Sequence, residues 1–151
     1  MKRILIASSA GGHLTEVMHL APLFEGHETV LVVNEIVQLP RYEFARIYHI
    51  DHAERDWRQL KNLGQALAIL AHERPDVIIS AGASPAVVFA IAAKVISNAR
   101  IVFLETAAAI NAPTLSGRLM YPLADEFYYQ WPSLSGFYPS GEYCPVVFGY
   151  G

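Results

Sequence analysis

The sequence predicts an α/β fold built around a doubly wound parallel sheet. Short runs of β-branched and apolar residues alternate with stretches whose apolar residues recur at helical spacing. The runs at 4–7, 29–33, 77–80 and 101–104 are almost entirely apolar, as expected for strands buried on both faces. Strands and helices that alternate in this way connect as right-handed crossovers in a parallel sheet. With no repeat or linker in the sequence, we expect one Rossmann-like domain over residues 1–151.

Composition excludes several classes of protein. The chain has 151 residues, 53% of them hydrophobic and 17% charged, so it can bury a full core and is not disordered. A net charge of −3 without a basic cluster argues against a nucleic-acid binder. Cys144 is the only cysteine, which excludes an internal disulfide and a cysteine-based metal site and fits a reducing compartment. We expect no metal and no organic cofactor.

A glycine-rich loop follows the first strand and leads into a predicted helix over 14–24. Gly11 and Gly12 permit a sharp turn, and the N–H groups of a helix start favour a phosphate or diphosphate. The spacing matches neither the dinucleotide-binding nor the Walker pattern, so tight packing of helix on sheet is an alternative interpretation. His13 is a candidate general base or phosphate ligand at this helix start, or else a helix cap.

Further polar residues follow the second predicted strand, at 29–33. Asn34 and Glu35 lie directly after it, on the edge where open α/β sheets bind ligands. Pro40 blocks regular structure in the next segment, and residues 46–50 read as a short third strand.

The clearest helix in the sequence spans 57–73. Its leucines at 60, 63, 67 and 70 are expected to line one buried face, with Asn62 on the surface. The apolar run of the first strand, near the N-terminus, is too short for a signal peptide or a membrane span.

A second small-residue turn, centred on Gly82, follows the strand at 77–80. Ser84 and Pro85 then predict a helix N-cap and first helical position. Residues 86–96 are apolar nearly all round, which predicts a buried core helix. Taken alone, the turn is also consistent with an ordinary helix start.

The C-terminal third begins with Glu105, which ends the strand at 101–104 on the ligand-binding edge. Residues 116–124 predict a short helix with much apolar surface, and residues 126–131 an aromatic strand. A turn-rich loop is expected over 132–141 and a last strand over 145–148. The aromatic side chains suit the core or, at the exposed end, a partner or membrane interface.

Three blocks together resemble a known family: SSAGGH at 8–13, PDVIISAG at 75–82 and LSGRLMYPLADEFYYQWP at 115–132. They are similar to the oligosaccharide-biosynthesis family that contains the membrane-recruiting subunit of the split dolichol-linked chitobiose synthase. Bacterial members are the PssD-type and EpsE-type proteins of capsule and exopolysaccharide assembly. The resemblance covers essentially the whole chain, and the third block is the most specific.

The resemblance implies the fold of the N-terminal, acceptor half of a GT-B glycosyltransferase. In this family a separate chain binds the nucleotide-sugar, and the pair acts on a polyprenyl-diphosphate-linked acceptor at the cytoplasmic membrane face. We therefore expect an acceptor-binding subunit of a UDP-sugar-dependent transferase that is inactive without its partner. We expect it to be peripheral at the inner face of the plasma membrane. The alternatives are a non-catalytic activator of a partner transferase and a free-standing module that binds a phosphorylated ligand.

The resemblance also suggests roles for individual residues. We favour His13 as the base that deprotonates the acceptor hydroxyl, because an imidazole pKa lies near operating pH. Glu105 is the second candidate, or else orients the acceptor sugar. The residues expected to bind substrate are Ser9, Gly11, Gly12, Glu35, Gly82, Ser84 and Arg118.

The sequence departs from the family at two places. An Arg often follows the motif glutamate of the family, where this chain has Ala109. Either Arg118 supplies the cation for the diphosphate or the acceptor contact differs, and Arg118 could equally be a solvated helix charge. The sequence also shows no N-terminal anchor like that of the eukaryotic member, so we expect its partner or an apolar surface patch to hold it at the membrane. The candidate patch is the helix predicted at 116–124, and its apolar side chains are Leu119, Met120, Tyr121 and Leu123. The alternatives are that these side chains are core or face the partner subunit.

Overall fold

The computed structural model of the protein describes residues 1–34, 40–51 and 58–146. In these residues the chain forms one sheet of seven parallel strands in the order β3-β2-β1-β4-β5-β6-β7. The strands are β1 (Arg3–Ser8), β2 (Glu28–Val33), β3 (Arg46–His49), β4 (Val77–Ala81), β5 (Arg100–Leu104), β6 (Glu126–Tyr129) and β7 (Glu142–Tyr143). Because the chain proceeds outward from β1 to β3 in one direction and from β4 to β7 in the other, the predicted doubly wound α/β fold is confirmed.

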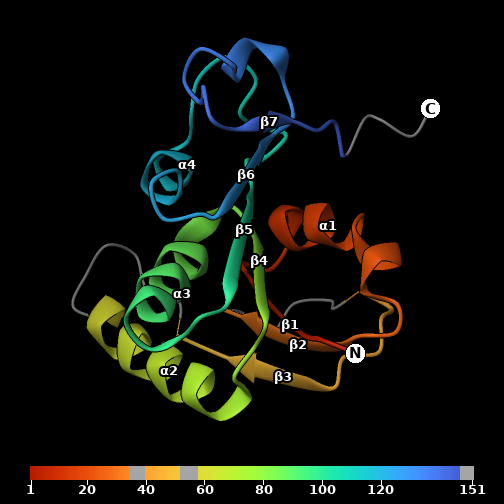
Figure 1. Ribbon diagram of the computed structural model, residues 1–151, viewed down its shortest axis with the longest axis vertical. Coiled ribbons are helices and arrows are strands. Elements are labelled where there is room, and N and C mark those ends of the chain that lie inside the picture. The colour runs from red at the N-terminus through yellow and green to blue at the C-terminus, as the bar shows by residue number, and fades with distance from the viewer. Residues whose placement is uncertain (35–39, 52–57, 147–151) are drawn as a thin grey trace.

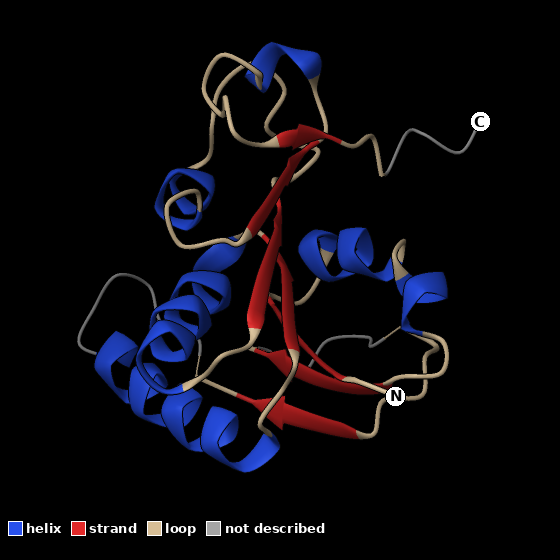
Figure 2. Cartoon of the chain, viewed as in Figure 1, coloured by secondary structure: helices blue, strands red, loops and turns tan. Residues whose placement is uncertain are grey.

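Helices cover both faces of this sheet. The helical segments are α1 (Gly12–Met18), α2 (Arg58–Glu73), α3 (Ala83–Ile96), α4 (Leu115–Met120) and the 3₁₀ turns η1 (Ala21–Phe24) and η2 (Pro132–Leu134). In Figure 1, α2 and α3 lie side by side on one face and α1 lies on the other. Figure 2 shows the sheet as a twisted central layer between them.

The core has two apolar layers, one on each face of the sheet. Leu5 and Ala7 of β1 point toward α2 and α3, whereas Ile4 and Ile6 point toward α1. All four side chains are buried, because successive residues of a strand face opposite sides and both sides are covered. This burial explains why the central strands read as unbroken apolar runs.

The first predicted helix, over 14–24, is shorter than expected. The structure ends α1 at Met18 and resumes with the 3₁₀ turn η1 at Ala21. Pro22 in that turn has no N–H to donate to an α-helical carbonyl, so a continuous helix is not possible there.

Three of the four leucines of the predicted buried face of α2, at 63, 67 and 70, pack against the core, and Leu60 is the exception. Leu60 is 74% exposed, whereas Asn62 is buried and its Nδ2 donates to the Asp51 carbonyl at 2.9 Å. Ala66 and Leu70 continue the buried stripe. The alanine-rich α3 packs against α2, and small side chains permit that close approach. Trp57, the first residue of the helix predicted over 57–73, lies outside the described residues.

The C-terminal strands also differ from expectation. The strand predicted over 126–131 ends at Tyr129, and β7 lies at Glu142–Tyr143 instead of over 145–148. The Cys144 amide still donates to the Tyr129 carbonyl at 2.8 Å, but the next residue, Pro145, has no amide hydrogen to extend the ladder. Residues 147–148 lie outside the described residues.

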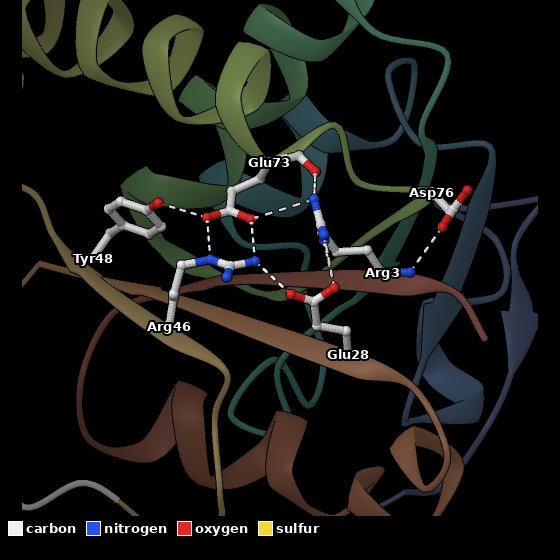
Figure 3. A network of polar contacts seen from close by, with 6 residues as sticks. All are labelled: Arg3, Glu28, Arg46, Tyr48, Glu73 and Asp76. Atoms are coloured by element: carbon white, nitrogen blue, oxygen red, sulfur yellow. Dashed lines mark hydrogen bonds and ion pairs between the residues drawn. The ribbon is translucent and has the colours of Figure 1, made fainter.

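A network of charged side chains joins α2 to the amino ends of the strands (Figure 3). The buried Glu73 carboxylate accepts hydrogen bonds from Arg46 at 2.6 and 2.8 Å and from the Tyr48 hydroxyl at 2.5 Å. Glu28 lies between the two arginines, 2.8 Å from Arg3 and 2.5 Å from Arg46. The network therefore ties the last turn of α2 to the first residues of β1, β2 and β3.

Burial by itself would raise the pKa of Glu73. The hydrogen bonds from Arg46 and Tyr48, together with the charges of Arg46 and Arg3, outweigh burial and lower this pKa. A carboxyl group whose pKa is lower in the folded state than in the unfolded state stabilises the fold above its ordinary value of 4.5. That contribution is lost as the pH falls through the folded-state pKa.

We expect Glu73→Gln to lower the free energy of unfolding by about 2 kcal/mol at neutral pH, because hydrogen bonds to charged groups contribute about that much. The difference from wild type should shrink in acid, where the wild-type carboxylate also becomes neutral. Urea unfolding at neutral pH and at about pH 3 measures both effects.

Asp51→Asn is the control for this measurement. It breaks an exposed pair with Lys61 at 2.5 Å and should change stability by less than about 0.5 kcal/mol. A Glu73→Gln deficit of equal size at both pH values would contradict the electrostatic explanation.

Candidate functional site

The order of strands in the sheet marks the place where a ligand is expected to bind. Strands β1 and β4 are neighbours, but the helices that follow them, α1 and α3, cover opposite faces. The loops after the two strands therefore diverge at the carboxyl edge, which is the topological switch point of such sheets. These loops carry the predicted residues of the glycine-rich turn and of the Gly82 turn, so the structure brings the two groups together.

The His13 side chain lies directly against the backbone of Gly82. A Cβ atom added to Gly82 would be 2.6 Å from Cε1 and 2.7 Å from Nδ1 of the imidazole, which is too close for any real side chain. Gly82 also has φ +70°, a conformation that L-residues rarely adopt. Glycine is therefore required at this position for the imidazole to lie where it does.

Neither helix start at the switch point is capped by a side chain. The N-cap residues are Gly11 for α1 and Gly82 for α3, and neither helix has a side-chain cap hydrogen bond. The prediction that Ser84 caps α3 is wrong, because the helix already begins at Ala83. The interpretation of His13 as a helix cap is likewise wrong. Uncapped N–H groups at a helix start suit an anionic ligand.

The backbone of these two loops is unusual. Gly11 and Gly82 have φ +91° and +70°, and Ala83 has φ +66°. A left-handed conformation costs a residue with a Cβ about 1–2 kcal/mol. Such local strain is characteristic of loops that bind ligands, which agrees with a site at this edge.

The remaining substrate-binding candidates are less closely associated with this edge. Ser9 is half-buried in the glycine-rich loop, and Asn34 ties β2 to the loop by accepting a hydrogen bond from the Ala10 amide at 3.2 Å. Arg118 is exposed on α4 and makes no ion pair with any residue that the structure describes. Glu35 lies outside the described residues.

Glu105, the second candidate base, is completely buried. Its Oε1 accepts hydrogen bonds from the Thr106 amide at 3.1 Å and the Thr114 hydroxyl at 2.8 Å. Its Oε2 accepts from the Thr114 amide at 3.2 Å and the Tyr138 hydroxyl at 2.6 Å. The expectation that this carboxylate faces the cleft is therefore wrong, because four protein donors occupy it. Glu105 instead positions the loop that follows β5.

This loop and α4 form a unit around Glu105. Thr114 is the N-cap of α4, and its hydroxyl accepts a hydrogen bond from the Gly117 amide at 2.9 Å. Burial, and then the hydrogen bond to Glu105, raises the pKa of Tyr138, so the phenol stays a donor. Sequence reasoning missed Thr114 and Tyr138. Thr is a favoured N-cap residue, so a Thr at the start of a predicted helix is the signal that could have identified Thr114.

Glu16 is a further residue of the site that the sequence did not single out. Its Oε1 accepts hydrogen bonds from the Thr106 hydroxyl at 2.8 Å and the Ala107 amide at 3.1 Å. On the other side, the Trp131 indole donates to the Ala107 carbonyl at 2.7 Å. Glu16 thus connects α1 to the loop after β5. The sequence signal that could have identified Glu16 is its spacing of three residues from His13, which puts both side chains on the same face of a helix.

Comparison with known proteins assigns the chain to a family. The sequence model of the family described as "Oligosaccharide biosynthesis protein Alg14 like" matches residues 34–147. The chain belongs to this Alg14-like family. The resemblance seen in the sequence is thereby confirmed at the level of the family.

Curated relatives agree with this assignment. A Yarrowia lipolytica protein named "UDP-N-acetylglucosamine transferase subunit ALG14" is 32% identical over 87 residues, which are 54% of this chain and 40% of the relative. A mouse protein of the same name is 21% identical over 175 residues, covering 93% of this chain and 81% of the relative.

Solved structures share the fold of this Alg14-like chain. MurG of Acinetobacter baumannii superposes with a TM-score of 0.76 at 16% identity, over 95% of this chain and 44% of MurG. The Staphylococcus aureus protein MnaA, solved with UDP, superposes with a TM-score of 0.66 at 17% identity, over 93% of this chain and 42% of MnaA. The chain thus spans less than half of each of these structures.

Two general properties of the described residues bear on the site. They contain no group of three or more His, Cys, Asp or Glu side chains arranged to hold a metal ion. Across residues 1–34, 40–51 and 58–146, no helix has the length and apolar character needed to cross a bilayer.

We expect Gly117→Ala to lower the free energy of unfolding by about 3 kcal/mol, the upper end of the usual cost of overpacking. A Cβ at this position would lie 1.8 Å from Glu105 Oε2 and 2.5 Å from the Tyr138 hydroxyl, so it would break the hydrogen bonds around Glu105. Denaturant unfolding of the isolated chain provides the measurement.

Gly64→Ala is the matched control. Gly64 is in the interior of α2, and a Cβ there would meet no atom within 4 Å. This change should stabilise the chain by about 1 kcal/mol through helix propensity. If Gly117→Ala were as harmless as Gly64→Ala, the buried Glu105 would not be the constraint that the structure indicates.

Proposed function

We propose that this chain is the acceptor-binding subunit of a two-chain, UDP-sugar-dependent glycosyltransferase that acts on a polyprenyl-diphosphate-linked saccharide. The observation that carries the proposal is the contact of His13 with Gly82 between two uncapped helix starts at the switch point. Membership of the Alg14-like family supports it, as does the transferase-subunit name of the relatives. That name makes UDP-N-acetylglucosamine the first donor to test.

The proposed reaction is displacement at the anomeric carbon of the donor sugar. The acceptor hydroxyl attacks this carbon, the bond to the diphosphate of UDP breaks, and His13 takes the hydroxyl proton. The acceptor diphosphate is held by the N–H groups of the Gly11–Gly12 turn and of the α3 start at Gly82, with Ser9 and Ser84 beside them. No residue beyond His13 is required to move a proton in this scheme.

A separate chain supplies the donor site in this proposal. The relatives are named subunits of a transferase, which supports a partner chain that binds the donor. We further propose an exopolysaccharide or capsule pathway, on the similarity of residues 115–132 to PssD-type and EpsE-type proteins. We also propose that the complex works at the inner face of the plasma membrane, because the proposed acceptor is a lipid.

The surface of α4 is the proposed contact with the membrane. Leu115 and Leu119, one helical turn apart, are 53% and 47% exposed, and Arg118 is exposed beside them. Apolar side chains with an adjacent cation suit a bilayer that carries diphosphate headgroups. The expectation that Met120 shares this role is wrong, because its side chain is only 1% exposed and packs in the core.

A non-catalytic activator is the second candidate function. The burial of Glu105 favours it, because one of the two candidate catalytic groups has a structural role. The two functions differ in what they require of His13, which an activator does not need.

We expect the chain alone to have no transferase activity and to gain it with its donor-binding partner. The assay mixes UDP-N-acetylglucosamine and other UDP-sugars with a polyprenyl-diphosphate-linked acceptor, with and without the partner chain. In the assembled enzyme, His13→Ala should lower turnover by about two to four orders of magnitude, the range for loss of a general base.

His19→Ala is the control, because this imidazole is exposed at the other end of α1. Robust turnover by the chain alone would overturn the two-chain proposal. Nearly normal turnover of His13→Ala in an intact complex would instead support the activator.

A flotation assay tests the membrane contact. With vesicles of phosphatidylethanolamine, phosphatidylglycerol and a polyprenyl diphosphate, we expect the double variant Leu115→Glu/Leu119→Glu to lose flotation while it stays folded and still binds the partner. Leu60→Glu, which changes an even more exposed leucine on α2, should float like wild type. Loss of partner binding with normal flotation would mean that α4 is a subunit interface.

A further inference from the structure

Two buried polar atoms on α1 lack hydrogen-bond partners. In the part of the chain that the structure describes, four buried side-chain atoms are unpaired, and two of them are His13 Nδ1 and Glu16 Oε2. The other two, on Asn62 and Gln65, lie on α2. Buried polar groups are almost always paired, so each exception needs an explanation.

The two unpaired atoms on α1 are chemically complementary. A neutral imidazole carries one proton, and a proton on Nδ1 needs an acceptor. Oε2 of a carboxylate is an acceptor that needs a donor. Side chains three residues apart on a helix lie on the same face, so a side-chain rotation can bring Nδ1 and Oε2 into contact.

The surroundings restrict how the pair can form. Glu16 Oε1 is already held by Thr106 and Ala107, which leaves only Oε2 for another donor. Nδ1 is among the ring atoms that lie next to Gly82, so the imidazole must rotate for Nδ1 to reach Oε2. The carboxylate is therefore the fixed member of the pair and the imidazole the movable one.

We propose that Glu16 is a positioning residue for His13: in the acceptor-bound enzyme, Glu16 Oε2 accepts a hydrogen bond from His13 Nδ1–H. This bond selects the tautomer whose Nε2 is unprotonated and can take the proton of the acceptor hydroxyl. The inference rests on the proposed function, in which His13 is the base. It also assigns Glu16 a second task besides holding the loop after β5.

Two variants separate positioning from simple attachment of the loop. Glu16→Gln keeps a carbonyl oxygen for Thr106 and Ala107 but replaces Oε2 by an amide group that cannot accept a hydrogen bond. Thr106→Val removes one bond to Oε1 and leaves Oε2 unchanged. If Glu16 only attached the loop, Thr106→Val would be the more damaging change.

The first measurement is steady-state kinetics of the complex with its partner chain. We expect Glu16→Gln to lower kcat by about 10- to 100-fold with the KM for the acceptor nearly unchanged, as is usual for residues that orient a reacting group. Thr106→Val should keep kcat within about twofold of wild type. Equal loss of kcat in both variants would overturn the inference.

The second measurement does not depend on activity. In the chain labelled with ¹⁵N-histidine and mixed with a short-chain polyprenyl-diphosphate saccharide, His13 should be found as the Nδ1–H tautomer with a downfield Nδ1 proton. Glu16→Gln should give a mixture of tautomers. A wild-type imidazole that is protonated on Nε2 or shows mixed tautomers would overturn the pairing, even if the Gln variant did not fold.

These outcomes distinguish failure of the pairing from failure of the proposed function. An inactive wild-type complex with the Nδ1–H tautomer present would contradict the transferase proposal and retain the pair. An active wild-type complex whose kcat and tautomer are insensitive to Glu16→Gln would contradict the pair and retain the transferase.

Discussion

The C-terminal third of this protein depends on one buried carboxylate. Glu105 ends β5 and is surrounded by four donors, from the backbone and hydroxyls of Thr106, Thr114 and Tyr138. A buried carboxylate that lost these donors would be costly, because water cannot replace them. The loop after β5, the cap of α4 and the segment that carries Tyr138 are therefore held in one arrangement. Gly117 is required because Glu105 occupies the space that a side chain would need.

The two edges of the sheet serve different purposes. At the amino edge, charged side chains begin neighbouring strands and pair across them, with Glu73 at the centre and Arg100 paired to Glu126 at 2.5 Å further along. At the carboxyl edge the loops are glycine-rich, strained at Ala83 and left with unpaired polar atoms. The charged network thus lies away from the switch point, where helix starts remain available to a ligand. At the carboxyl edge, the hydrogen bonds to Glu105 hold the neighbouring loop after β5.

A position directly after a strand correctly predicts the location of some site residues and not the direction of other side chains. His13 and Gly82 follow β1 and β4, and the parallel register of those strands brings them into contact. Glu105 also follows a strand, yet its side chain turns inward to the loop and Tyr138. Strand-end position predicts the edge on which a residue lies, but the direction of its side chain also depends on donors such as Thr114 and Tyr138, which are 9 and 33 residues further along. Glu16 went unnoticed because the partners of its carboxylate lie 90 residues away.

The sequence by itself determined the parallel α/β fold, the glycine-rich turn after β1 and the family, because strand and helix periodicity and short motifs are local properties of the chain. Only the tertiary structure decided which member of an apolar or polar group is buried. Leu60 is exposed while Asn62 is buried, where its amide donates to the carbonyl of Asp51 in the loop before α2. Met120 packs in the core and Leu119 is 47% exposed, a difference that depends on which face of α4 meets the core cluster. Such choices depend on which surfaces meet, and that is a property of the whole fold and not of any one segment.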